Sequence, residues 1–216
     1  LTATPDRPDG LTELMWWHFG RKLLELQQSD MVDAGLVLSP SIEWLHTGWE
    51  GAGRDMDWPK FINSMTQDDS RNRKILERVK QAVAKGRQVL VLSDRVAHCE
   101  MIAEQMNACG ISSAALVGRL SKKKRAELLK DADDKKLSVI TATTIADEGL
   151  DLPNLDTVVL TTPTKAMGRV QQRIGRVMRK APGKRKPLVI DCLDEVGSLR
   201  GLARKRFKLY SKMGCS

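Results

Sequence analysis

Short apolar runs alternate with longer amphipathic stretches along the chain from about residue 70 to its end. The apolar runs predict strands within 88–93, 112–118, 137–143, 155–162 and 186–192. Apolar residues three or four positions apart predict helices within 68–86, 95–110, 121–132 and 196–213. Strands that alternate with helices and are apolar on both faces are typical of a parallel sheet covered by helices. We therefore predict an α/β fold with a parallel sheet flanked by helices.

Ligands of such sheets bind beyond the carboxyl ends of the strands. We therefore expect functional loops after Leu92, Val117, Thr141 and Leu160.

The first 69 residues follow a less regular pattern. Residues 1–10 hold two prolines, two aspartates and a glycine, which is typical of a loop that leaves a strand. Residues 11–69 carry all five tryptophans and predict a helix over 23–34, then extended segments over 36–49. Clustered tryptophans can stack on bases, but they more often pack in cores and interfaces. We expect this stretch to be a linker or extension that packs against a neighbouring domain.

Positive charge is concentrated at the C-terminal end of the chain. The net charge is +9, and residues 169–216 hold 14 Lys or Arg against three acidic residues. This distribution favours contact with a polyanion such as a nucleic acid, although a solvated basic surface explains it too. The last helix, within 196–213, is expected to place Leu199, Phe207 and Tyr210 on an apolar face, with Arg204 and Arg206 among the basic residues around it.

The composition sets further limits. Apolar residues make up 41% of the chain, but no run approaches the ~20 residues of a membrane span, so no membrane partner is expected. The four cysteines form no C-x-x-C pair, which favours reduced thiols and an intracellular location in the cytoplasm or the nucleoid or nucleus. The three histidines are scattered, so no metal site is expected.

One candidate site lies in the stretch "QQRIGRVMR". In a helix, Gln172, Arg176 and Arg179 are spaced i, i+4 and i+7 and share one face. Gly175 allows a backbone or ligand to approach beside them. Arginine side chains bind phosphate oxygens through two parallel hydrogen bonds. The pattern favours an anion site, and the alternative is a basic, solvated helix face.

A second candidate site lies in "ITATTIADEGLDLP". Thr143 and Thr144 follow an expected strand, where hydroxyl and backbone N–H groups suit a phosphodiester chain. Gly149 and Asp151 come next, and Asp151 is able to accept a hydrogen bond from a ribose hydroxyl or from an arginine.

These stretches together resemble the superfamily 2 helicases. "ATTIADEGLDLP" is similar to motif V of that family, "QQRIGRVMR" to motif VI and "QVLVLSDR" to motif IV. "ALVGRLSKKKR" resembles the strand that ends in glycine before a basic helix, and "LTATPDRPDG" resembles motif III. The chain resembles the branch of repair, restriction and phage DNA helicases in three features. These are the form of motif III, the Gln that opens motif VI and the stretch "DMVDAGLVLSP". The DEAD-box RNA branch usually has His where motif VI opens.

The resemblance implies a RecA-like fold and roles for individual residues. It makes Arg176 and Arg179 arginine fingers toward the γ-phosphate of ATP, with Gln172 in the same region. It places Gly149 and Asp151 near the ribose of the nucleotide. It assigns nucleic-acid contacts to Ser93, Arg95, Gly118, Arg119, Thr143 and Thr144. It gives Thr2 and Thr4 a role in coupling hydrolysis to nucleic-acid binding.

The chain departs from the family at the phosphate-binding loop. No G-x-x-x-x-G-K-[ST] sequence is present, because Gly183 and Lys184 are followed by Arg185. The pair Asp147 and Glu148 is better explained as surface acids than as the acidic box that holds Mg²⁺ in the family. We therefore expect ATP and Mg²⁺ to be bound mainly by a missing N-terminal RecA-like domain. Residues 1–10 would be its tail, 11–69 an interdomain linker or extension, and 70–216 the second RecA-like domain.

The expected function is the C-terminal motor domain of an ATP-dependent DNA helicase or translocase. The chain alone should then hydrolyse ATP negligibly. An RNA helicase domain is one alternative. The other is a non-enzymatic module that binds nucleic acid or a partner, which Arg176 and Arg179 argue against because mere docking does not need them.

Overall fold

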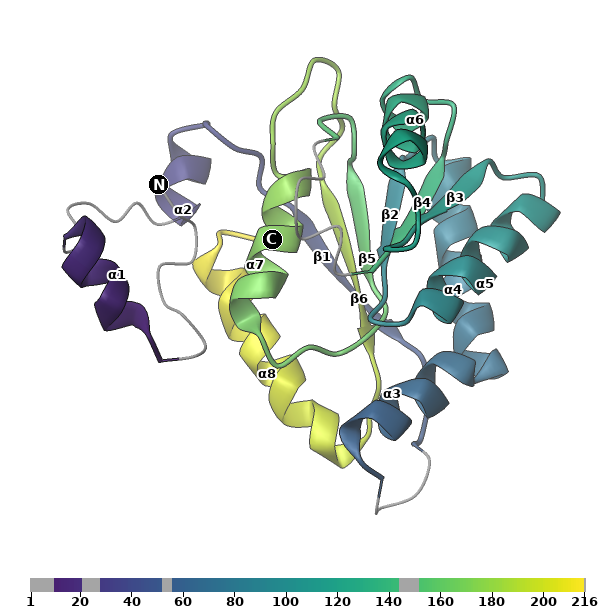
Figure 1. The fold of residues 1–216 in the computed structure, drawn as a ribbon, viewed down its shortest axis with the longest axis horizontal. Coiled ribbons are helices and arrows are strands. Elements are labelled where there is room, and N and C mark those ends of the chain that lie inside the picture. Colours follow the sequence, from purple (N-terminus) through teal and green to yellow (C-terminus); the bar gives the residue numbers. More distant parts are fainter. Residues whose placement is uncertain (1–9, 21–27, 52–55, 144–151, 216) are drawn as a thin grey trace.

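A computed structural model describes residues 10–20, 28–51, 56–143 and 152–215 (Figure 1). The strands are β1 (Ser41–His46), β2 (Val89–Leu92), β3 (Ser113–Leu116), β4 (Val139–Ala142), β5 (Thr157–Leu160) and β6 (Leu188–Leu193). The helices are α1 (Thr12–Phe19), α2 (Gln28–Asp33), α3 (Trp58–Gln67), α4 (Asp69–Ala84), α5 (Val96–Ala108), α6 (Lys122–Asp133), α7 (Met167–Val177) and α8 (Gly197–Lys212). The strands form one sheet in the order β1-β6-β5-β2-β4-β3, and every pair is parallel. The predicted fold class is confirmed.

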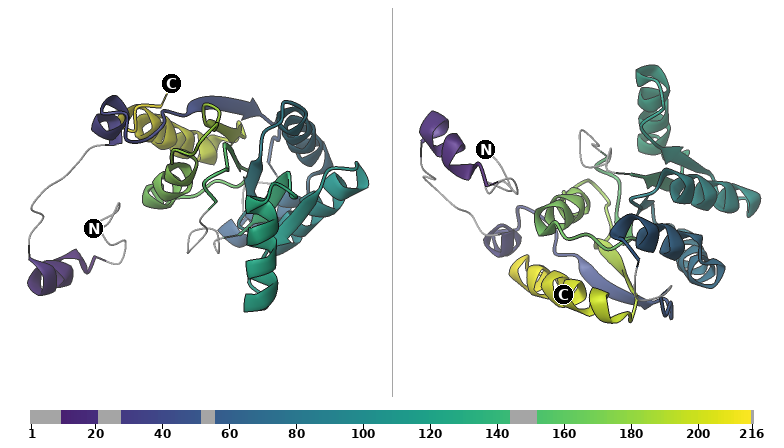
Figure 2. Two further views of the ribbon diagram at one scale, coloured as in Figure 1. Left: turned by 90° about the horizontal axis from the view of Figure 1, so that it is seen from above. Right: turned by 60° about the horizontal axis from the view of Figure 1, so that its bottom comes forward.

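The sheet is buried on both faces, as its apolar strands predict. Leu90 of β2 packs in one core with residues of α7 and α8, whereas Val89 and Val91 pack in the other core with residues of α4 and α5. Alternate residues of a strand point to opposite faces, so one short strand contributes to both cores. Figures 1 and 2 show the sheet between these two helical layers.

Helix ends follow the signals in the sequence. The side chain of Asp68 caps α4 by accepting a hydrogen bond from the backbone N–H of Arg71 at 2.7 Å. Ser121 caps α6 by accepting from the N–H of Lys124 at 3.2 Å. The chain leaves α4 through Gly86, whose φ of +73° is readily adopted only by glycine.

Part of the stretch 11–69 joins the sheet. β1 is an edge strand, and it pairs with β6 from Ser41 with Leu188 to His46 with Leu193. α3, which the sequence analysis did not foresee, packs through Phe61 on Trp49, with ring centroids 5.1 Å apart, and on the start of α8. The division of the chain at residue 70 stays a prediction. These contacts place tryptophans of the stretch in packing roles.

The expected apolar face of α8 is wrong at two positions. Phe207 is 61% exposed, whereas Arg206 is 5% exposed. The reason is a buried carboxylate on β6: Arg206 Nε lies 2.6 Å from Asp191 Oδ2, and the hydroxyl of Tyr210 donates to the same oxygen. Arg206 therefore faces the sheet, and Phe207, one position further, points to solvent.

The first helix is set apart from this arrangement. In Figures 1 and 2, α1 lies away from the sheet and from the helices that cover it. Two of its aromatic side chains are largely exposed, Trp17 at 76% and Phe19 at 85%. None of the helices in the described ranges is long and apolar enough to cross a membrane.

Candidate functional site

The carboxyl ends of all six strands meet at one edge of the sheet, because all pairs are parallel. The ladder of backbone hydrogen bonds continues just past the strands. The N–H of Ser93 donates to Ala142 O at 3.1 Å, and the N–H of Thr161 donates to Leu92 O at 3.0 Å. The residues that follow the strands are therefore held in a fixed row, and we call it the carboxyl edge. It contains Thr47, Ser93, Thr143, Thr161 and Asp194.

A buried ion pair fixes one half of this edge. The guanidinium of Arg71, which is 0% exposed, donates from Nε to Asp194 Oδ1 at 2.7 Å and from Nη2 to Asp194 Oδ2 at 3.1 Å. Nη2 also donates to the carbonyl of Thr161, and the hydroxyl of Thr47 donates to Asp194 Oδ1 at 2.5 Å. One arginine on α4 therefore connects the ends of β1, β5 and β6.

A second buried network of hydrogen bonds fixes the other half of the carboxyl edge. His98 on α5 lies 3.0 Å from Asn72 Oδ1 through Nε2 and 2.9 Å from Ser93 Oγ through Nδ1. Burial lowers the pKa of His98 to about 3, and the charge of Arg71 acts in the same direction. The ring is therefore neutral near pH 7. Since the amide N of Asn72 donates to Thr66 O, Asn72 Oδ1 accepts from His98 Nε2, and Nδ1 then accepts from the hydroxyl of Ser93.

The sequence-predicted nucleic-acid residues in the described part of the chain lie along the carboxyl edge, at different depths. Ser93 is buried under it, and Thr143 is 9% exposed. Gly118 is exposed, and Arg119 is exposed and paired with Glu100 of α5. Arg95 is partly buried, because its guanidinium donates to Pro59 O at 3.0 Å and to the side chain of Asn63 on α3. Their role in binding nucleic acid stays a prediction.

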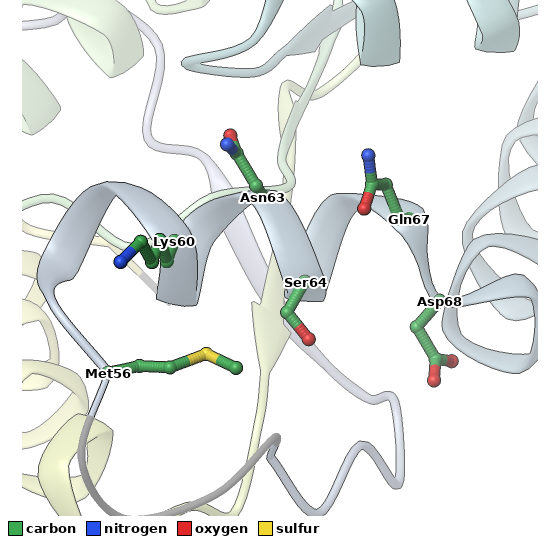
Figure 3. Close-up of a pocket in the computed structure, with 6 residues that line it drawn as sticks. All are labelled: Met56, Lys60, Asn63, Ser64, Gln67 and Asp68. Carbon is green, nitrogen blue, oxygen red and sulfur yellow. The ribbon is translucent and has the colours of Figure 1, made fainter.

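An open depression of about 520 Å³ runs along α3 beside Arg95. Figure 3 shows the side chains around it, which are those of Met56, Lys60, Asn63, Ser64, Gln67 and Asp68. The lining has one positive and one negative group, and it contains none of the sequence-predicted site residues. The depression adjoins the candidate site through Asn63, which accepts a hydrogen bond from Arg95.

The helix α7 carries the other predicted group. Its buried side packs Val170, Ile174 and Val177 into the core. A second side lies under Gln28 of α2, which donates to Met178 Sδ at 3.1 Å and accepts from Gln171 Nε2 at 3.3 Å. Two sides of the helix are thus held by other elements.

The third side of α7 carries the predicted residues. Gln172 is exposed and Arg176 is partly buried. Arg179 is exposed but lies two residues beyond the last helical residue, Val177. Met178 keeps helical backbone angles and its N–H donates to Ile174 O at 3.2 Å, so Arg179 follows directly on the last turn, and the shared role of the three residues stays a prediction. Gly175 is not sterically required, since an added Cβ would lie 3.8 Å from Gln28 Nε2.

The structure separates the two groups of predicted residues. α7 starts after the carboxyl end of β5, and the N–H of Leu38, which precedes β1, donates to Met178 O at 2.8 Å at the other end of the helix. At about 1.5 Å per residue, the path from Met167 to Arg179 covers about 18 Å. The C-terminal end of α7, which carries Arg176, thus lies toward the amino ends of the strands, and Arg179 follows directly on it. Figure 1 shows α7 running beside the sheet in this direction.

Arg173 on α7 was missed by the sequence analysis. It is 2% exposed, and its Nη2 lies 3.4 Å from Asp94 Oδ1 in the loop after β2. This contact ties α7 to the carboxyl edge. An arginine between Val170, Ile174 and Val177 is the signal that could have revealed a buried ion pair, because an apolar helix face rarely holds an unpaired charge.

Some predicted residues lie outside the described residues: Thr2, Thr4, Thr144, Gly149 and Asp151. Within the part of the chain that the structure describes, no group of three or more His, Cys, Asp or Glu is placed to hold a metal ion. The guanidinium groups of Arg176 and Arg179 suit the phosphates of a nucleotide.

Comparisons with known proteins agree with this architecture. A family model described as "Helicase conserved C-terminal domain" matches residues 71–181. "Putative helicase 22" of Sulfolobus islandicus filamentous virus is 34% identical over 136 residues, which are 63% of this chain and 24% of that protein. "Probable helicase D10" of Escherichia phage T5 is 24% identical over 216 residues, which are 99% of this chain and 47% of the phage protein. The chain thus spans about a quarter and about half of these relatives.

Solved structures share the fold. The crystal structure of the RNA-helicase Prp28 from Chaetomium thermophilum bound to ADP matches with a TM-score of 0.57 at 19% identity. The match covers 82% of this chain and 37% of that one. The likeness at this identity concerns the fold alone.

Proposed function

The chain belongs to the superfamily 2 helicases as their C-terminal RecA-like domain, and we propose from this that it is the second motor domain of an ATP-dependent DNA helicase or translocase. In this proposal the domain supplies arginines to a nucleotide site that it shares with another domain. It also supplies part of a groove for nucleic acid.

One observation carries the proposal: α7 is held on two sides and presents Gln172 and Arg176 on the third, with Arg179 exposed just beyond its end. Those three residues occupy the motif VI positions of the resemblance. A guanidinium on a clamped helix needs little reorganisation to meet a phosphate, which is the condition for electrostatic catalysis. An arginine finger contributes on the order of 10³–10⁵ in kcat, or about 4–7 kcal/mol of barrier.

We place the remaining parts of the nucleotide site in a preceding RecA-like domain. ATP and Mg²⁺ would be bound mainly there, because this chain has neither the phosphate-binding loop nor an acidic box. Two observations support such a partner. The relatives are two to four times longer than the matched region. The apolar side chains of α1 are exposed, as Trp17 and Phe19 show, which is typical of a surface that packs on another domain.

Nucleic acid would bind along the carboxyl edge. Arg95, Arg119 and Thr143 lie there at the ends of neighbouring strands, and positive and hydroxyl groups suit a phosphodiester backbone. Closure of the two domains would bring Arg176 and Arg179 to the bound nucleotide, and reopening would move the strand along this edge. Arg173, which joins α7 to Asp94, gives a direct physical link between the two regions.

The nucleic acid is proposed to be DNA, with RNA as the second candidate. Gln172 opens the motif VI stretch, where the DEAD-box RNA branch usually has His, and this favours DNA. The sequence similarity to a pre-mRNA-splicing ATP-dependent RNA helicase of Schizosaccharomyces pombe, 28% identical over 146 residues, favours RNA. A module without catalytic function would not need Arg176 and Arg179.

The test is an ATPase assay on the full-length protein with double-stranded DNA, single-stranded DNA or RNA as stimulant, and with the present chain alone as control. We expect DNA to raise kcat most, and the chain alone to show no ATPase above background. Stimulation by RNA alone would replace the DNA assignment. Robust ATPase of the chain alone that co-purifies with it and is lost in Arg176→Ala would overturn the proposed division of the site.

A further inference from the structure

A proline-glycine turn brings Lys184 back toward the end of α7. The N–H of Lys184 donates to Ala181 O at 3.2 Å, with Pro182 and Gly183 in the two central positions. Gly183 has a φ of +68°, the left-handed value that the third position of a type II turn requires. This is the same Gly-Lys pair that lacks the remaining residues of a phosphate-binding loop. Its role in the structure is therefore a different one.

The ammonium of Lys184 joins two backbone segments. Nζ donates to Arg179 O at 2.8 Å and to Pro153 O at 2.9 Å. Arg179 lies beyond the helical hydrogen-bond pattern of α7, so its carbonyl needs a partner from elsewhere. A lysine near a helix C-terminus is well suited to this, because it binds the last carbonyls and interacts favourably with the helix dipole.

The surroundings of Lys184 make these hydrogen bonds sensitive to its charge. Burial lowers the pKa of the ammonium to about 8 from its ordinary 10.5, the negative charge of Asp156 opposes this effect, and the positive charge of Arg179 adds to it. Asp156 itself lies just before β5, with Arg87 Nη1 3.7 Å from its Oδ1. Lys184 is thus a partly buried cation between one carboxylate and one guanidinium.

We propose that Lys184 is a positioning residue for Arg179: its ammonium bridges the carbonyl oxygens of Arg179 and Pro153 and so fixes the backbone from which the Arg179 guanidinium projects. Pro153 ends the motif V stretch, and Arg179 ends the motif VI stretch. Lys184 therefore ties the exits of these two stretches together. This inference rests on the proposed function, because it assumes that Arg179 acts on a nucleotide.

The test uses the full-length protein with saturating nucleic acid and measures kcat and KM for ATP at pH 7. Lys184→Met should lower kcat at least about tenfold while KM changes less than about threefold, since small misplacements of a catalytic group cost much of its effect. Lys184→Arg keeps a charged donor and should retain most of kcat. Lys180→Met removes an exposed charge from the same loop and should leave kcat within about twofold.

The pH profile separates positioning from simple stabilisation. The kcat of the wild type should fall as pH rises through about 8, because Lys184 then loses its proton, and Lys184→Arg should lack this fall. Between about pH 8 and pH 10.5 the folded domain should gain stability, because the unfolded chain holds the proton of Lys184 more tightly than the folded chain does. The fall in kcat is therefore not a consequence of unfolding.

The outcomes distinguish the inference from the function on which it rests. Arg179→Ala with unchanged kcat would overturn both. If Arg179→Ala loses kcat but Lys184→Met keeps it, with or without a lower melting temperature, the positioning role fails and the proposed function stands. Should Lys184→Met fail to fold, an identical pH profile in the wild type and in Lys184→Arg overturns the positioning role.

Discussion

Buried polar side chains hold the carboxyl edge of the sheet. Arg71 pairs with Asp194, and His98 joins Ser93 to Asn72. Removing one partner of a buried ion pair costs about 3–5 kcal/mol, because the other charge stays buried. Arg71, Asp194, His98 and Asn72 are not among the predicted ligand contacts, but they fix the residues from which the loops of the carboxyl edge begin.

The buried histidine gives the domain an acid sensitivity. Its folded pKa of about 3 lies below the ordinary 6.5, so between these values the unfolded chain binds a proton that the folded chain does not. Stability therefore falls as pH drops from 6.5 toward 3, by roughly 3–5 kcal/mol for a shift of this size at about 1.4 kcal/mol per unit.

Urea denaturation of the chain at pH 7 and pH 4 measures this effect. The wild type should lose more stability between the two than His98→Gln, which has no proton to gain. His46→Gln, at an exposed position, is the control for the substitution itself. An equal loss in the wild type and in His98→Gln would contradict a buried neutral imidazole.

Single-residue chemistry could be read from the sequence only in part. Arg176 and Gln172 were found because helical spacing places them on one side of α7. Lys184 was not found as a partner of Arg179, because the contact depends on a turn that returns the chain. Arg71 and Asp194 lie 123 residues apart, so nothing local in the sequence pairs them.

At the scale of elements, the order of helices and strands from residue 70 onward was predictable. Asp68 and Ser121 cap α4 and α6, and the strands are short, mostly apolar runs. β1 was harder, because it mixes Glu43 and His46 with apolar residues, and its place at the sheet edge depends on pairing with β6 more than 140 positions away. The side of α8 that faces the sheet was also not predictable from the helix alone, because it depends on Asp191 in β6.

Two of the three arginines of α8, Arg206 and Arg204, allow a matched test of its docking. Arg206→Met should lower the free energy of unfolding by about 2–4 kcal/mol, because it leaves the carboxylate of Asp191 buried with Tyr210 as its remaining described donor. Burial raises the pKa of Asp191, so part of this loss should be recovered at low pH, where the carboxyl becomes neutral.

Arg204→Met is the control on the same helix. Arg204 is exposed, and the substitution should change the free energy of unfolding by less than about 0.5 kcal/mol. Urea denaturation of both variants measures the difference. Equal effects would show that Arg206 does not face the sheet.

At the scale of the whole molecule, two regions on one rigid sheet serve one proposed cycle. The carboxyl edge lies at one end of the strands, and the end of α7 with Arg179 lies toward the other. Arg173 joins them through Asp94, and α1 exposes Trp17 and Phe19, where we propose that a further domain packs. A motor needs such separation, because nucleotide and nucleic acid have to be bound at the same time.

The central claim is that Arg176 and Arg179 complete a nucleotide site whose phosphate cradle lies in another domain. The most direct measurement is kcat for ATP, with the dissociation constant for ATP measured separately, in full-length Arg176→Ala and Arg179→Ala with Lys180→Ala as control. We predict that each arginine variant loses about 10³-fold or more in kcat while ATP affinity stays within about tenfold, and that the control is unaffected. An unchanged kcat in both arginine variants would contradict the account.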